Sequence, residues 1–116
     1  MAATWENIDQ YLVRHYGRQS GIGEDDTLAN IICYKGSDIV GYINFYLEGH
    51  VPESKLETLG TGAPKQFIML RFAIDRIDEI LNTLRQEKPI HIAVDPGQKI
   101  GWVGTGAEPI GEEEAV

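Results

Sequence analysis

Four side chains in this 116-residue chain have the chemistry of metal ligands or of catalytic acids, bases and nucleophiles: His15, Cys33, His50 and His91. No two of them have the short spacing that preorganises a zinc site, so the sequence predicts no metal site. Cys33, His91 and Asp95 would form a thiol, a base and an orienting carboxylate only if the fold brought them together. Because Cys33 lies inside an apolar run, a buried and unreactive thiol is the favoured interpretation. We therefore predict no catalytic residue.

Two glycine-rich strings raise the question of phosphate binding, since glycine lets backbone N–H groups approach an anion closely. They cover residues 60–64 and 104–109, but the second lacks the helix that follows a dinucleotide loop, and neither resembles a complete P-loop. No cofactor is therefore expected. A small-ligand pocket or an enzyme site is the alternative if six residues converge: Gly60, Thr61, Gly62, His91, Asp95 and Trp102.

Three tyrosines point to a binding surface. Tyr42 and Tyr46 share one face of a predicted strand whose other face is apolar, and Tyr34 on the preceding strand is expected to lie near them. Tyrosine is enriched at protein interfaces because it buries a large rigid area and keeps a hydrogen-bonding hydroxyl. If a helix packs on this row, the tyrosines are second-layer core residues instead.

Two segments with helical periodicity are expected to help position these residues. Trp5, Ile8 and Leu12 recur at helical spacing after Thr4, a good N-cap residue, which predicts a helix from Thr4 to Tyr16. A second helix is predicted to begin at an Asp75 cap. Its single apolar stripe of isoleucines and leucines spans residues 77–84 and ends before a proline at position 89.

Five segments are predicted to be strands, because they are rich in β-branched and aromatic residues or alternate between apolar and polar positions. They are Leu28–Tyr34, Ile39–Leu47, Gln66–Ala73, Ile90–Val94 and Lys99–Val103. Turn sequences at 35–38 and 95–98 join the first pair and the last pair into hairpins. Gly41 interrupts an apolar face and marks a bulge or a close backbone contact. The glycine-rich excursion over 48–65 is expected to include a short strand near 55–59.

These elements predict an α+β domain over residues 1–106, with the element order α-β-β-β-α-β-β. It would have a mostly antiparallel sheet of about five strands with two helices packed on it. Residues 107–116 contain four glutamates and are expected to form an acidic, flexible C-terminal tail.

Composition limits the partners. The formal net charge of −8 repels nucleic acid and anionic lipid and favours basic or neutral partners. A single cysteine excludes an intramolecular disulfide, which favours the reducing cytoplasm. No apolar run approaches the ~20 residues of a membrane-spanning helix.

The favoured function is a non-catalytic protein-binding or regulatory module, acting as an inhibitor, an adaptor or a self-associating subunit. Its contacts would come from the aromatic face of the sheet that carries Tyr42 and Tyr46. A small-ligand-binding protein or enzyme is the second hypothesis. Single-stranded nucleic-acid binding by stacking on the tyrosines is the third, and the scattered basic residues disfavour it.

Overall fold

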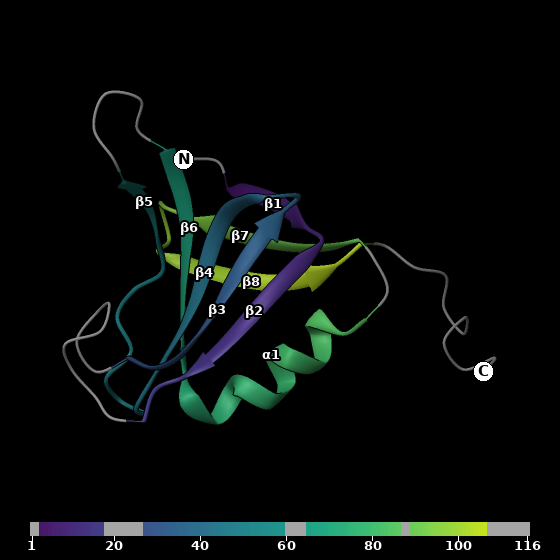
Figure 1. Cartoon of the computed structure of the whole chain (residues 1–116). Coiled ribbons are helices and arrows are strands. Elements are labelled where there is room, and N and C mark those ends of the chain that lie inside the picture. The colour runs from purple at the N-terminus through teal and green to yellow at the C-terminus, as the bar shows by residue number, and fades with distance from the viewer. Residues whose placement is uncertain (1–2, 18–26, 60–64, 87–88, 107–116) are drawn as a thin grey trace.

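The computed structural model describes residues 3–17, 27–59, 65–86 and 89–106, which form two β-sheets and one short helix (Figure 1). The large sheet has the strand order β2-β3-β4-β6-β5 and the small sheet the order β1-β7-β8. The strands of the large sheet are β2 (Gln10–His15), β3 (Thr27–Lys35), β4 (Asp38–Tyr46), β5 (Lys55–Leu59) and β6 (Lys65–Ala73). Those of the small sheet are β1 (Thr4–Ile8), β7 (Ile90–Asp95) and β8 (Ile100–Thr105). A 3₁₀ turn, η1 (Ile74–Arg76), leads into α1 (Ile77–Leu84).

The predicted α+β fold with two helices is wrong, because the segment from Thr4 to Tyr16 forms β1 and β2 instead of a helix. The spacing of its apolar residues fits a helix. Its β-branched and aromatic side chains also suit strands, however, and two antiparallel partners are available. β1 pairs with β7 and β2 pairs with β3, so tertiary pairing overrides a weak local helical pattern. The described part of the chain is therefore mostly β-structure.

Asp9 forms the joint at which the chain leaves the small sheet and enters the large one. Its backbone N–H donates to the carbonyl oxygen of Tyr34 at 2.9 Å. Its carboxylate accepts from the N–H of Gly36 at 3.0 and 3.1 Å, which ties the joint to the β3–β4 turn. The N-terminal segment thus contributes one strand to each sheet.

The other predicted strands form at the predicted positions in the sequence, but the last hairpin lies in a different sheet from the one predicted. β3 and β4 form the predicted antiparallel hairpin, β5 occupies the expected short segment, and β6 is an interior strand that pairs in parallel with β4. β7 and β8 form the second hairpin. β7 also pairs with β1, so this hairpin lies in a separate sheet and does not join the predicted five-stranded one.

α1 and the small sheet cover one face of the large sheet, and the strands of the small sheet run across those of the large one (Figure 1). Side chains from all three units form one buried cluster. Its members include Ile31, Ile43, Phe45 and Leu70 from the large sheet, Ile92 and Val94 from the small sheet, and Ile80, Leu81 and Leu84 from α1. The apolar stripe predicted for this helix is therefore buried as expected. Asp75 makes no capping hydrogen bond, so its predicted role as N-cap is wrong.

Two glycines let the sheets approach closely. A Cβ at Gly41 would clash with the side chain of Ile92 and lie 2.7 Å from the carbonyl oxygen of Ile68. A Cβ at Gly101 would clash with the side chain of Leu70 and lie 2.9 Å from the carbonyl oxygen of Ala93. The close contact predicted at Gly41 is confirmed, and the β3–β4 register also shifts beside it.

Candidate functional site on the small sheet

Five residues on the outer face of the small sheet, which we call the tryptophan face, form the candidate site: Trp5, His91, Ala93, Ile100 and Trp102. Trp5 on β1 and Trp102 on β8 both pair with Ala93 on the central strand β7. Since neighbouring strands lie about 4.8 Å apart, the two tryptophans are separated by about 10 Å across the sheet. Ala93 is completely buried between them. Its small side chain forms the floor of the face.

His91 connects the two tryptophans. The rings of His91 and Trp5 meet edge to face, with their centroids 4.7 Å apart. On the other side, the indole Nε1–H of Trp102 donates to Nε2 of His91 at 3.2 Å. An acceptor at Nε2 requires the neutral imidazole with its proton on Nδ1. Burial lowers the pKa of His91 below its ordinary value of 6.5, which also favours the neutral form.

Gly104 makes room for this arrangement. It pairs with His91 across β7 and β8, and a Cβ there would lie 3.0 Å from Cε1 of the His91 ring. A side chain at this position would crowd the imidazole and force it to shift by a few tenths of an ångström. Gly104, the first residue of the second glycine-rich string, therefore helps to accommodate the aromatic cluster.

The tryptophan face is apolar and accessible. Trp5 is 59% exposed, Ile100 is 52% exposed and Trp102 is 39% exposed. Large side chains of this kind supply most of the binding energy at protein interfaces, with tryptophan the most enriched. The hydrogen bond from Trp102 occupies Nε2 of His91, so this histidine holds the aromatic side chains in place and is not set up as a free general base.

Of the residues proposed from the sequence for a ligand pocket, the structure brings two together. His91 and Trp102 meet as expected. The Asp95 carboxylate instead accepts from the backbone N–H groups of Gly97 and Gln98 at 2.9 and 3.2 Å, which makes it part of the β7–β8 turn. The other members of that prediction, Gly60, Thr61 and Gly62, lie outside the described residues.

The predicted tyrosine row lies on the face of the large sheet opposite the core, as its register requires. Tyr34 and Tyr42 are half-buried, and the ring centroid of Tyr42 lies 5.9 Å from that of Phe67. Tyr46 is only 1% exposed, and its hydroxyl accepts a hydrogen bond from Nε of Arg71 at 3.2 Å. Tyr46 is therefore a structural residue, and the row offers less contact area than the tryptophan face.

The alternative nucleophilic arrangement does not form. Cys33 is buried in the core between the sheets, and burial raises the pKa of its thiol to about 12. His91 lies on the far side of the small sheet, so the thiol and the imidazole do not meet. Among the described residues, no group of three histidine, cysteine or acidic side chains is placed to hold a metal ion.

Trp5 is the candidate residue that the sequence analysis missed. The predicted helix from Thr4 to Tyr16 counted Trp5 among its apolar residues, which would pack on the sheet. The signal that could have found it is the alternation of Trp5 and Asn7 with Thr4, Glu6 and Ile8, which is the period of a strand with one exposed face.

Within the described ranges, no helix has the length and apolarity to cross a membrane. Comparisons with protein-family models, with curated proteins and with solved structures found no match to this chain.

Proposed function

We propose that this protein is a non-catalytic protein-binding module that docks an apolar, basic segment of another protein on the tryptophan face. The observation that carries the proposal is the grouping of Trp5, Ile100 and Trp102, three large and exposed apolar side chains, on one face of three strands. Isolated exposed apolar residues are common on proteins, whereas a contiguous patch marks an interaction site. His91 fixes both indoles, which lowers the entropy cost of binding.

The net negative charge of the chain favours a partner with positive charge. At −8 the chain repels a second copy of itself and also nucleic acid, and it attracts a basic polypeptide. A separate basic partner is therefore favoured over a homodimer. A cytoplasmic location is part of the proposal, since a single buried thiol suits a reducing compartment.

A random-peptide display library, selected on the purified protein, tests the proposal. Trp5 and Trp102 are the only tryptophans in the chain, so their fluorescence reports directly on the proposed surface. Selected peptides should be rich in lysine, arginine and large apolar residues, and they should shift the tryptophan emission to shorter wavelength. Trp5→Ala and Trp102→Ala should each weaken peptide binding by roughly tenfold or more, the loss typical of a hot-spot residue.

Leu47→Ala is the matched control, because Leu47 is 45% exposed but lies outside the tryptophan face. Circular dichroism should show that all three variants stay folded. Peptides that bind the tryptophan variants as tightly as the wild type would overturn the proposal. Sedimentation over a range of concentrations provides the second measurement. A dimer that Trp5→Ala dissociates would replace the basic partner with a second copy of the chain.

A further inference from the structure

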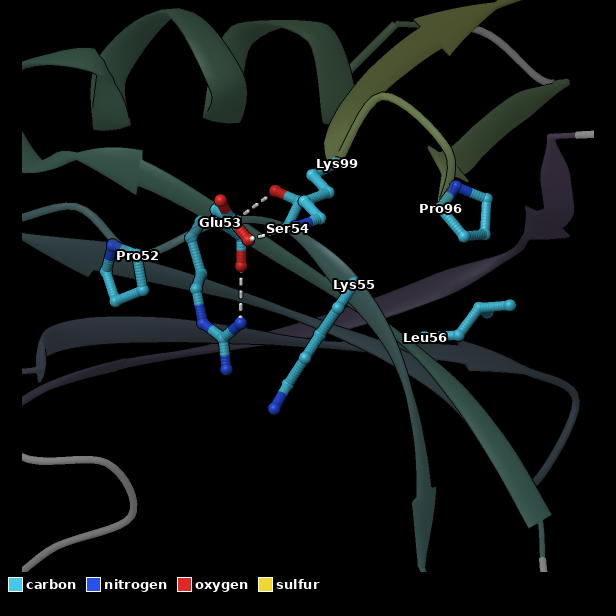
Figure 2. Close-up of a pocket in the computed structure, with 8 residues that line it drawn as sticks. Pro52, Glu53, Ser54, Lys55, Leu56, Pro96 and Lys99 are labelled. Atoms are coloured by element: carbon cyan, nitrogen blue, oxygen red, sulfur yellow. Dashed lines mark hydrogen bonds and ion pairs between the residues drawn. The ribbon is translucent and has the colours of Figure 1, made fainter. Parts of the chain in front are cut away.

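A second site lies away from the tryptophan face, in the hollow between the start of β5 and the β7–β8 turn (Figure 2). Its volume is about 610 Å³, which is within the range of small-molecule sites. We propose that this hollow binds a small molecule through an anionic carboxylate or phosphate group. The proposal is independent of the protein-binding function and rests on different residues.

Positive charge gathers at this hollow in a chain that is otherwise strongly acidic. Three of the ten lysine and arginine residues line it, namely Lys55, Arg71 and Lys99. Among the described lining residues the one acidic side chain is Glu53, whose carboxylate oxygen lies 3.6 Å from Nζ of Lys99. Cationic side chains therefore outnumber anionic ones by three to one among the described residues of the lining. A concave cationic surface of this kind concentrates anions.

Arg71 provides a fixed and almost fully buried cation in the wall. It is only 7% exposed, yet it lines the hollow. Its Nη1 donates to the Glu53 carbonyl oxygen at 2.6 Å, and its Nε donates to the Tyr46 hydroxyl at 3.2 Å. These bonds set the plane of the guanidinium, and a planar guanidinium matches the geometry of carboxylate and phosphate oxygens.

The backbone on both sides of the hollow is held in place. The hydroxyl of Ser54 accepts from the backbone N–H of Arg71 at 3.0 Å, which fixes the start of β5 against β6. Leu56, Pro52 and Pro96 add apolar wall, so the hollow can take the carbon skeleton of a small organic anion as well as its charged group. Figure 2 shows Lys55 extending away from Lys99 and Glu53.

Lys99 adds an independent observation. Its φ angle is 60°, in the left-handed region where glycine is the ordinary residue, and it is the one non-glycine residue with positive φ among those described. Its backbone N–H donates to the Asp95 carbonyl oxygen at 2.7 Å, which closes the turn. Non-glycine residues in sparsely populated backbone regions cluster at active sites and ligand sites. Glycine would suit this backbone conformation but would lack the ammonium group. The lysine at this position therefore points to a role for its charge.

The test uses nuclear magnetic resonance titration of the full chain with two probes, inorganic phosphate and succinate, at constant ionic strength. We expect saturable shifts of the backbone amides of Ser54, Lys55, Arg71 and Lys99. Tighter binding of phosphate would assign the natural ligand to phosphate compounds, and tighter binding of succinate would assign it to carboxylates. Either result supports the proposal.

Three variants distinguish a built site from general attraction to positive charge. Lys99→Gly removes a charge and suits the left-handed backbone, so it should fold at least as well as the wild type while weakening probe binding about fivefold or more. Lys55→Gln should weaken binding to a similar extent. Arg85→Gln also removes one exposed positive charge, but its position just after α1 lies outside the hollow, so it should leave affinity within about twofold. Linear shifts without saturation, or equal losses in all three variants, would overturn the proposal.

Discussion

His91 makes the tryptophan face sensitive to pH. Its neutral ring accepts the Trp102 N–H, and burial lowers its pKa below 6.5. A lowered pKa means that the folded protein binds a proton less readily than the unfolded chain does. The contribution of neutral His91 to the free energy of unfolding is therefore fully present above pH 6.5. It is lost as the pH falls through the folded-state pKa.

We expect the urea midpoint of the wild type to fall on mild acidification, and tryptophan emission to change as His91 protonates and releases the Trp102 N–H. His91→Gln should remove this part of the pH dependence. The control is His50→Gln, because His50 is exposed and lies outside the tryptophan face. Equal pH profiles for the wild type and His91→Gln would contradict the assignment.

Cys33 should be chemically silent in the folded protein. A thiol with a pKa of about 12 forms almost no thiolate at neutral pH, and the thiolate is the reactive species. A chromogenic disulfide reagent should therefore react slowly with the native chain and with one equivalent after unfolding in urea. Fast labelling under native conditions would show that the core opens around β3.

Gly41 and Gly101 test how the two sheets are packed. Alanine at either position would press on the facing sheet, and overpacking of this kind typically costs about 1–3 kcal/mol. We expect Gly41→Ala and Gly101→Ala to lower the free energy of unfolding by this amount in urea titrations. Gly17→Ala is the matched control, since nothing lies within 4 Å of a Cβ there. An equal change in all three would mean that the general backbone effect of replacing glycine, and not packing between the sheets, sets the cost.

At the level of elements, sequence patterns predicted most segments that carry their own local signal. Strand alternation and turn residues located both hairpins, and the apolar stripe over 77–84 located α1. The first segment failed because Trp5, Ile8 and Leu12 fit a helical period as well as a strand, and only the distant partners β7 and β3 decide between them.

The same ambiguity between helix and strand explains why Trp5 was not predicted as part of the tryptophan face. Trp102 and His91 were singled out together, and their contact follows from the hairpin that joins them. Trp5 reaches His91 only through the pairing of β1 with β7, which no local pattern encodes. Arg71 and Lys99 likewise line one hollow only because the two sheets pack together. Sites assembled from distant segments are poorly predicted from one sequence because their geometry is a property of the tertiary fold.

For the whole molecule, the shared core predicts that both sheets unfold together. The buried cluster contains residues of the large sheet, the small sheet and α1, so neither sheet retains a core of its own. Tryptophan fluorescence reports only on the small sheet, whereas circular dichroism reports on both. We expect the two urea transitions to coincide, as in two-state unfolding. A fluorescence transition at lower urea would show that the small sheet detaches first.

The passage of the first strands through both sheets has a consequence for how the protein is made. β1 emerges early from the ribosome, but its partner begins at Ile90, so Thr4 must wait for Val94 before the pair can form. The large sheet can assemble from residues 10–73 while synthesis continues. Trp5 therefore gains its His91 neighbour only when β7 has been translated, and Trp102 joins the face only with β8. An incomplete chain would lack the surface that we propose recognises the partner, so binding itself would report that synthesis had reached β8.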